Sequence, residues 1–249
     1  MALAVDASTP VIASVGSGVF SVTTASFTPP VDSLLVAVCF SDNATGSSND
    51  PAPTVTNSGT AFTWTLGPAR NPSEDNGGSC KIYTAKVTVS QAMTVTYATG
   101  GSGGTGHACK LKVEVVTGQD LTSPIGATGE GSSATNNITP TVYTSTVDLS
   151  LAIGGAVDWS ANGVPTSTDV EDGAHTANQI SAVACYKAST TTPSGSAVTL
   201  NFDAAGAAAA DWNWVAVEIK PAAGETVTID KWDRPMSEPV RRRKTTVPV

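Results

Sequence analysis

An alternation of apolar and polar residues with a period of two runs through most of this chain. Between Lys110 and Val115 every second residue is leucine or valine, and the residues between them are charged. The same period returns from Trp214 to Lys220. This period is typical of a β-strand with one face on a core and the other in solvent, and β-branched residues favour strands. A helical period is almost missing, so the pattern predicts an all-β protein of short antiparallel strands, packed as a sandwich.

Turn-forming residues separate these segments, and the composition is that of a folded protein. Clusters of Gly, Asn, Asp and Pro occur at 43–53, 71–78, 100–106 and 193–195. With 40% hydrophobic residues and a mean hydropathy of +0.03, the chain fits neither a disordered segment nor a membrane protein. Its longest apolar run, Leu34–Phe40, is far shorter than the roughly 20 residues of a membrane-spanning helix. We therefore expect no membrane partner.

Five short sequence matches occur in the same order in the two halves of the chain, displaced by between 103 and 116 positions. The matched pairs are Phe27–Pro30 with Ile138–Thr141, Val31–Phe40 with Val147–Trp159, Ile82–Ala85 with Cys185–Ala188, Met93–Tyr97 with Val198–Phe202, and Val113–Val115 with Val217–Ile219. Such an order predicts a duplicated unit of about six strands. We expect a first β half at residues 1–117, a second at 118–222 and an extended C-terminal arm at 223–249.

Two packings of these halves fit the pattern. Each half can form its own Ig-like sandwich, since about 100 residues suffice for one. Alternatively, the two halves share one jelly-roll-like sandwich. The second half has no clear counterpart to the strand expected around Phe62–Thr65, and an incomplete unit standing alone would expose a sheet edge. This favours a single shared body.

The four cysteines, Cys39, Cys80, Cys109 and Cys185, contain no C-x-x-C pair. The segment Met1–Asp6 lacks the basic start and apolar core of a signal peptide, so we expect a chain made for the cytosol. The cysteines are then expected to be buried free thiols, with a Cys39–Cys109 disulfide between sheets as the alternative. Ligand-like spacing is missing, so no metal site is predicted.

Two strings in the glycine-rich segment 100–106 imitate catalytic motifs. Residues 101–106 spell G-x-G-x-x-G, but a dinucleotide site needs a helix next, and the following residues alternate as a strand. Residues 100–104 spell G-x-S-x-G, but a nucleophile elbow needs a strand-to-helix turn and a base. His107 and His175 are the two histidines, and no carboxylate is placed to orient either. We predict no catalytic or cofactor-binding residue, no cofactor, and a protein that is not an enzyme.

Acidic clusters at Asp42–Asn43, Glu74–Asn76 and Asp169–Asp172 offer oxygen ligands. None of them has the spacing of an EF-hand loop. Turn residues on an acidic surface explain the clusters without a metal ion.

The tryptophans allow two interpretations. Trp212 and Trp214 share one face of a predicted strand, and Trp64 and Trp159 lie elsewhere. Exposed tryptophans can stack on sugar rings, whereas buried ones close the end of a core. We favour the core interpretation.

The net charge of −8 is unevenly placed along the chain. The last twenty residues hold six Lys and Arg against three Asp and Glu, a net charge of +3. The preceding residues hold seven against 18, a net charge of −11. An acidic body has no basic face to neutralise phosphates, so no nucleic-acid partner is predicted.

The segment after Pro221 has no apolar alternation and cannot build a core of its own. A tryptophan in such an arm is a good binding anchor, and arginines beside it can pair with carboxylates on a neighbour. We predict that the partner-binding residues are Trp232, Arg234, Arg241, Arg242, Arg243 and Lys244. A partner with an acidic groove, including the body of a second copy, would suit both residue types.

The arm segment Asp230–Arg241 reads D-K-W-x-x-P-x-S-x-P-V-R. It resembles segments near the C-termini of structural proteins of tailed bacteriophages. The body is similar to phage and prophage virion proteins in Thr28–Pro30 (T-P-P), Ser33–Val38 (S-L-L-V-A-V) and Val215–Ile219 (V-A-V-E-I). This resemblance implies a virion structural protein and carries no catalytic residue.

These features together favour a capsid decoration or cement protein. Its expected partners are the major capsid protein, other virion proteins and neighbouring copies of itself, on a particle assembled in the host cytoplasm. A rigid body with a flexible arm gains avidity on a repeating lattice. The alternatives are a tail or fibre protein that binds host glycans through Trp159, Trp212 or Trp214, and a secreted carbohydrate-binding module or enzyme.

Overall fold

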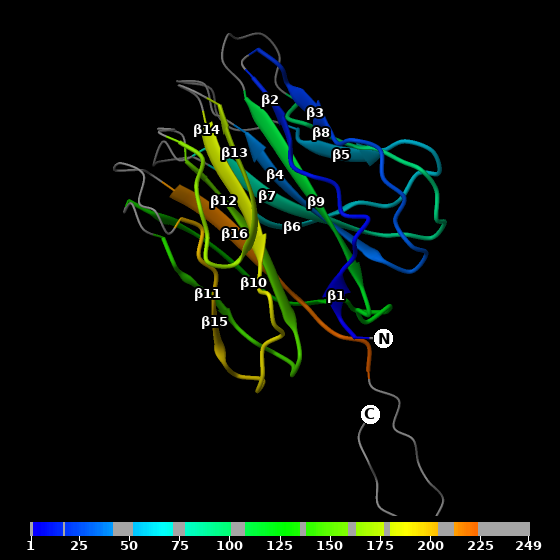
Figure 1. The fold of residues 1–249 in the computed structure, drawn as a ribbon, viewed down its shortest axis with the longest axis vertical. Helices are drawn as coiled ribbons and strands as arrows, with labels where there is room; N and C mark the ends of the chain where they lie inside the picture. Colours follow the sequence, from blue (N-terminus) through cyan, green and yellow to red (C-terminus); the bar gives the residue numbers. More distant parts are fainter. Residues whose placement is uncertain are drawn as a thin grey trace, which may run out of the picture.

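The computed structural model describes residues 2–16, 18–41, 52–71, 78–100, 108–134, 138–158, 163–176, 180–203 and 212–223. These residues form sixteen β-strands and no helix (Figure 1). The first nine strands are β1 (Ala4–Val5), β2 (Ala13–Val15), β3 (Ser21–Thr23), β4 (Leu34–Ser41), β5 (Thr54–Asn57), β6 (Thr65–Arg70), β7 (Ser79–Lys86), β8 (Val95–Ala98) and β9 (Cys109–Thr117). The other seven are β10 (Ile125–Ser133), β11 (Thr141–Thr144), β12 (Leu151–Asp158), β13 (Val170–Thr176), β14 (Ile180–Tyr186), β15 (Ala197–Thr199) and β16 (Trp212–Ile219). The described part contains no helix that is long and apolar enough to cross a membrane.

Two large sheets form the middle of the molecule, one from each half of the chain. The first has the strand order β1-β9-β4-β7-β6, with β2 also paired to β9, and the second has the order β10-β16-β12-β14-β13. Two small sheets, β3-β8-β5 and β11-β15, complete the described strands. The strand pairs are antiparallel, and each joins strands of the same half. The prediction of an all-β antiparallel sandwich is confirmed.

The sheets stack as four layers with three hydrophobic cores between them. The central core lies between the two large sheets, where Val36, Val38 and Phe40 of β4 meet Ile153 of β12 and Val217 of β16. Each of these side chains is at most 1% exposed. Burying one such side chain contributes roughly 1.5–3 kcal/mol, so this core holds the halves together.

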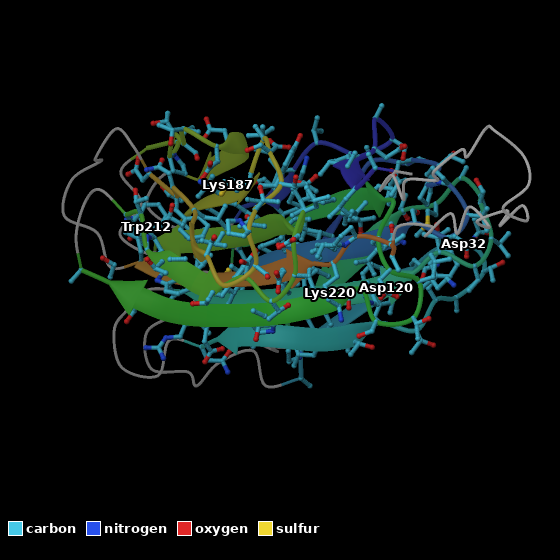
Figure 2. The ribbon with its side chains drawn as sticks, turned by 90° about the horizontal axis from the view of Figure 1, so that it is seen from below. Asp32, Asp120, Lys187, Trp212 and Lys220 are labelled. Atoms are coloured by element: carbon cyan, nitrogen blue, oxygen red, sulfur yellow. The ribbon has the colours of Figure 1, made fainter. Side chains whose placement is uncertain are left out.

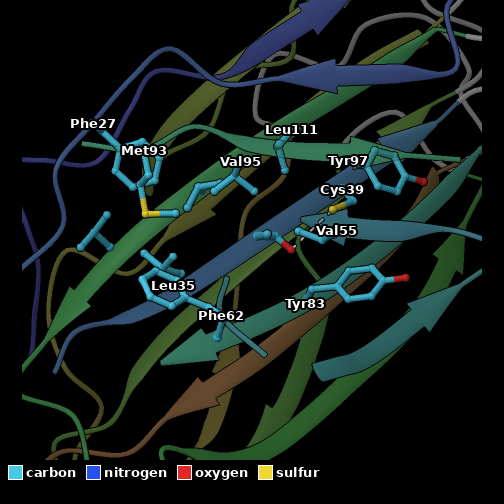
Figure 3. Packing of buried hydrophobic residues seen from close by; sticks show 14 of the residues in the cluster. Phe27, Leu35, Cys39, Val55, Phe62, Tyr83, Met93, Val95, Tyr97 and Leu111 are labelled. Carbon is cyan, nitrogen blue, oxygen red and sulfur yellow. Dashed lines mark hydrogen bonds between the residues drawn. The ribbon is translucent and has the colours of Figure 1, made fainter. Parts of the chain in front are cut away.

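Each large sheet is covered on its other face by the small sheet of its own half. In the first half, Leu35 of β4 and Tyr83 of β7 pack against Met93, Val95 and Tyr97 (Figure 3). In the second half, the corresponding core contains Ile138, Val142, Tyr143, Val198, Leu200, Phe202, Trp212 and Trp214. Every residue of β4, β12 and β16 is therefore buried, not every second one.

This double coverage corrects one expectation about the strands. The charged residues Lys110, Lys112 and Glu114 of β9 do not face solvent but are 0%, 6% and 2% exposed. They alternate with Leu111, Val113 and Val115 as expected, but their face of the sheet is turned toward the second half. The period of two correctly predicted a strand, but the prediction that its polar face lies in solvent was wrong.

The two large sheets approach closely where β12 carries glycine. A Cβ added to Gly155 would lie 2.5 Å from Val38 Cγ1 and 2.7 Å from Phe40 Cζ. At one edge of the stack, the Ala69 amide of β6 donates to Glu130 Oε2 of β10 (3.2 Å). At the opposite edge, β9 and β13 leave a hollow that is described below.

The duplication is visible in the sheet order, but the predicted matches are partly out of register. Asp32 and Leu149, which precede β4 and β12, share a positive φ of 64° and 59°, so Leu34 and Leu151 occupy equivalent places. Leu34 pairs with Val116 and Leu151 with Ile219. The predicted match of Val113–Val115 with Val217–Ile219 is thus one residue off, and a one-residue shift exchanges the two faces of a strand.

The strand count also differs between the halves. The described residues give nine strands in the first half and seven in the second, where six each were expected. Two positions account for the difference: β1 and β2 both pair with β9 where β10 alone pairs with β16, and β5 (Thr54–Asn57) of the three-stranded outer sheet has no partner position in the two-stranded one. β6 and β13 hold the same position, so among the described residues the strand near Phe62–Thr65 has a counterpart and β5 does not. The boundaries at 117/118 and 222/223 stay predictions.

All four cysteines are free and buried. Cys39 of β4 and Cys109 of β9 lie on adjacent strands of one sheet, not in two sheets, and both belong to the outer core of the first half. The expectation of buried free thiols is confirmed, and the alternative disulfide is not formed.

Candidate functional site

The six predicted partner-binding residues of the arm, Trp232, Arg234, Arg241, Arg242, Arg243 and Lys244, lie outside the described residues. What the structure describes is the point where the chain leaves the body. After β16, the Lys220 amide donates to the Pro124 carbonyl oxygen (2.7 Å) and the Ala222 amide to that of Gly118 (2.8 Å). Figure 2 shows Asp120 and Lys220 beside each other, well separated from Trp212 at the start of β16.

The N-terminus meets the chain exit at the same place. Gly118 has a φ of +78°, and a Cβ added to it would lie 2.3 Å from the Ala2 carbonyl oxygen. Because this position needs a positive φ and close approach, glycine suits it best. The first residues, the join between the halves and the exit of the arm therefore converge where β9 and β16 end, at one end of the two large sheets (Figure 1).

Most of the motif strings from the sequence lie outside the described residues. This holds for residues 101–106 with Ser102, for His107, and for the acidic clusters Asp42–Asn43 and Glu74–Asn76. The cluster Asp169–Asp172 is described, and its members have different partners. Asp169 Oδ1 lies 2.9 Å from Lys187 Nζ, and its Oδ2 accepts from the Asn201 amide (2.8 Å). Among the described residues, no group of three or more His, Cys, Asp or Glu side chains is placed to hold a metal ion.

The two tryptophans of β16 belong to a core. Trp212 is 1% and Trp214 8% exposed, and the ring of Trp214 stacks on Phe202 with centroids 6.5 Å apart. Trp64 is partly buried and donates to Asn57 Oδ1 (3.3 Å). The core interpretation is confirmed for Trp212 and Trp214, whereas Trp159 lies outside the described residues.

A hollow of about 290 Å³ opens between the two halves, and we call it the junction pocket. It lies where the edge of the first large sheet meets strands β13 and β14 of the second. Its walls are formed by Val5, Asp6, Ala7, Thr9, Lys112, Glu114, Val170, Glu171, Asp172 and Tyr186. The pocket thus gathers four carboxyl groups and one ammonium group, with apolar surface from two valines and a tyrosine ring beside them.

Lys112 joins the two halves at the floor of the pocket. Its ammonium nitrogen lies 3.0 Å from Asp172 Oδ2 of β13 and donates to the Pro10 carbonyl oxygen (2.8 Å). Asp172 Oδ2 also accepts from the Ile12 amide (2.7 Å). Because both charges are largely removed from water and are hydrogen-bonded, this pair fixes the position of β13 against β9.

Glu114, two residues further along β9, is the unusual group of the pocket. Its Oε1 is 3.9 Å from Lys112 Nζ, while its Oε2 is buried and accepts no hydrogen bond from any described residue. Burial raises the pKa of Glu114 to about 7; the nearby Lys112 ammonium opposes the rise and Asp172 adds to it. A buried carboxyl group without a full set of donors favours its neutral form.

The carboxyl groups nearer the mouth differ from Glu114. The pKa of Asp6 is lowered because Ser8 lies beside its carboxylate and donates its backbone amide to Oδ1 (2.9 Å). Burial raises the pKa of Glu171, with Asp203 and Asp172 adding to the rise. The pocket therefore carries more negative than positive charge, which suits a cationic group.

The junction pocket was not predicted from the sequence. Lys112 and Glu114 were predicted to lie on a solvent face, and Asp172 was predicted to be a surface turn residue. A usable signal was present, because β9 carries both a lysine and a glutamate between apolar residues, and opposite charges on one strand face suit a shared buried partner. Comparisons of the chain with protein-family models, curated proteins and solved structures give no match.

Proposed function

We propose that the protein is a non-enzymatic structural protein of a tailed-phage particle, specifically a decoration or cement protein of the capsid. It docks on the capsid lattice through its β body and its C-terminal arm. Support comes from the arm segment Asp230–Arg241 and from the body segments that resemble virion proteins. The partners in this proposal are the major capsid protein and neighbouring copies of the chain.

The observation that carries the proposal is the place where the arm begins. The chain leaves the four-layer body beside Gly118 and Ala2, at one end of the stack. A body built on three cores acts as a rigid block, and an arm attached to its end reaches sites beside the block. Two linked contacts of this kind raise occupancy well above that of either contact alone.

The charge distribution fits the same proposal. The body carries a net charge of −11 and the last twenty residues +3. Like-charged bodies repel one another in solution, whereas the basic arm pairs with carboxylates on a neighbour. Specific contacts on a lattice therefore determine where the protein sits.

The glycan-binding alternatives receive less support from the molecule. Two of the three tryptophans proposed to stack on sugars, Trp212 and Trp214, are buried in the outer core of the second half. A ring inside a core has no free face for a sugar. We therefore carry neither the tail-fibre nor the carbohydrate-module alternative further.

Particle binding tests the proposal. Heads and tails of the phage or prophage that encodes the protein are separated, and mass spectrometry locates the chain in one fraction or the other. Full-length protein is then added to heads that lack it, alongside a variant without residues 230–249. We expect the full chain on heads, and binding at least tenfold weaker for the variant, with an unchanged circular dichroism spectrum.

A matched control keeps the length and charge of the arm. It carries residues 230–249 in shuffled order, so a loss of binding in this variant assigns the contact to the motif and not to charge alone. Presence of the protein in tails only, or no binding to heads, would overturn the decoration proposal. Full occupancy by the variant without the arm would overturn the role of the arm.

A further inference from the structure

The junction pocket has an unused acceptor and surplus negative charge. Glu114 is 2% exposed, yet its Oε2 accepts no hydrogen bond from the described residues. Asp6, Glu171 and Asp172 stand around the same hollow, and Lys112 is the cation that faces them from β9. Lys112 is already bound to Asp172 and to the Pro10 carbonyl oxygen and lies 3.9 Å from Glu114 Oε1, and no salt bridge joins Asp6 or Glu171 to a cation of the described residues.

The shape of the pocket matches one long cationic side chain. Its volume of about 290 Å³ lies just below the range for small-molecule sites, roughly 300–1,000 Å³. The apolar wall formed by Val5, Val170 and the Tyr186 ring suits an aliphatic stem or a planar guanidinium, which stacks on aromatic faces. A guanidinium also has five donors in a fork that pairs with carboxylates in two places. Arginine therefore fits this pocket better than a compact ammonium.

A source of arginine is attached next to the pocket. The Ala222 amide is bound to the Gly118 carbonyl oxygen, and Ala2, which touches Gly118, is three residues before Val5 of the pocket wall. Arg241 follows Ala223 by 18 residues, and an extended segment of that length spans roughly 60 Å. The arm is therefore long enough to reach the pocket, and a tether this short places the arginines at an effective concentration in the millimolar range.

We propose that, in the free protein, the junction pocket holds an arginine of the run Arg241–Arg243 from the chain's own arm. The guanidinium pairs with the carboxyl groups of Asp6 and Glu171 at the mouth and faces Glu114 at the floor. This deepens the proposed function and rests on it in one respect: the arm that contacts the particle is first kept on its own body. Release from the pocket then precedes docking on the lattice.

Zero-length cross-linking with a carbodiimide tests this on the full-length protein. The reagent joins an amine to a carboxyl group that it contacts, and Lys244 stands directly beside the three arginines. Equal amounts of unlabelled and ¹⁵N-labelled protein are mixed at pH 7.5 and cross-linked, and the products are identified by mass spectrometry. We expect Lys244 to be joined to Asp6, Glu171 or Asp172, in pairs that carry a single isotope composition.

Two variants and one matched control make the result specific. Glu114→Gln removes the charge at the floor but leaves every reactive carboxyl group at the mouth, and we expect a cross-link yield about threefold lower. Replacing Arg241, Arg242 and Arg243 together by glutamine changes nothing in the described body, and we expect at least a fivefold loss. Glu130→Gln removes an equal charge from β10, at the opposite edge of the stack, and is expected to leave the yield unchanged.

Each other outcome overturns the proposal. Cross-links spread evenly over the carboxyl groups of the body, or an equal yield from wild type and Glu114→Gln, would show that the pocket does not hold the arm. Mixed-isotope pairs would show that the arm of a second copy enters the pocket. Failure of this inference is distinguishable from failure of the proposed function, because head binding is measured without cross-linking and the cross-links are measured without particles.

Discussion

Two buried glutamates, one in each half, show how the same residue type takes opposite roles in this fold. Glu114 belongs to β9 and Glu218 to β16, and these strands hold equivalent positions in the two large sheets. Glu114 lines the junction pocket opposite strands β13 and β14 of the second half, whereas Glu218 accepts from Thr146 beside the outer layer of its own half. Both are at most 2% exposed.

The two glutamates differ in the hydrogen bonds that their carboxyl groups accept. Burial alone would raise the pKa of Glu218, but the Thr146 hydroxyl (2.5 Å) and the Ala127 and Thr146 amides (2.8 Å each) donate to its carboxylate and lower the pKa below its usual value. Glu114 has one distant lysine and an unused oxygen, and its pKa rises to about 7. A buried carboxylate that accepts several hydrogen bonds stabilises the fold, whereas a buried carboxyl group with few donors keeps an oxygen that can accept from a ligand.

Removing the Glu218 carboxylate is the largest expected disturbance. Glu218→Ala leaves the Ala127 and Thr146 amides without their acceptor, and we expect a loss of about 4 kcal/mol in the free energy of unfolding, measured by urea denaturation at pH 7. Glu218→Gln keeps one acceptor oxygen and is expected to lose about half as much. Because the folded pKa of Glu218 is lowered, its contribution is present above the unfolded value of roughly 4.3 and is lost as the pH falls through the folded pKa. A loss below about 1 kcal/mol for Glu218→Ala would contradict this account.

Neutralising Glu114 is expected to act in the opposite direction. With a folded pKa of about 7 and an unfolded pKa of roughly 4.3, the folded protein holds a proton that the unfolded chain has released. Stability therefore falls as the pH rises through this window, by up to about 4 kcal/mol in all. Glu114→Gln removes this fall, so its stability relative to the parent chain should increase between pH 5 and pH 8.

The background for that measurement is the variant with Arg241, Arg242 and Arg243 replaced by glutamine, so that no arginine of the arm affects Glu114. Urea denaturation at pH 5 and pH 8 gives the two differences. Glu130→Gln serves as the control and is expected to parallel the parent. If the stability of Glu114→Gln also changes between pH 5 and pH 8 as that of the parent does, the pKa of Glu114 is not raised and the contrast with Glu218 fails.

Removing Lys112 is the smallest of the three disturbances. Lys112→Met breaks the 3.0 Å contact with Asp172 and takes away the cation nearest Glu114. We expect a loss of about 2 kcal/mol at pH 7, and a further rise in the pKa of Glu114, seen as a fall of stability that extends to higher pH. Lys86→Met removes an exposed pair with Asp32 (3.2 Å) and should cost at most about 0.5 kcal/mol. Equal costs for the two lysines would mean that the pair at the pocket is no stronger than a surface one.

The fold class was predicted correctly from local patterns, and the errors in the finer predictions have a physical cause. The alternation in 110–115 and 214–220 correctly predicted strands, and the repeated order of segments anticipated two halves with equivalent large sheets. The match of Val113–Val115 with Val217–Ile219 was misleading because the similar strings V-E-V and V-E-I lie one residue apart in register. Similarity of letters cannot show which face of a strand points inward.

The junction pocket was beyond reach for a related reason. Its members, from Val5 to Tyr186, are separated by up to 181 positions in the chain. They meet because the edges of two sheets from different halves face each other. The arm residues from Trp232 to Lys244 were found by composition and motif alone, and their partner-binding role stays a prediction.

The order of residues along the chain was enough to predict an all-β body with buried free thiols, and it gives directly the contrast between an acidic body and a basic tail. These properties depend on near neighbours, since strand period and turn chemistry act over a few residues. The stacking of four layers, the burial of Lys112 and Glu114, and the pocket between the halves depended on the packing of whole sheets. Burial and pKa are set by everything that surrounds a group, and in this molecule much of that surrounding comes from the other half of the chain.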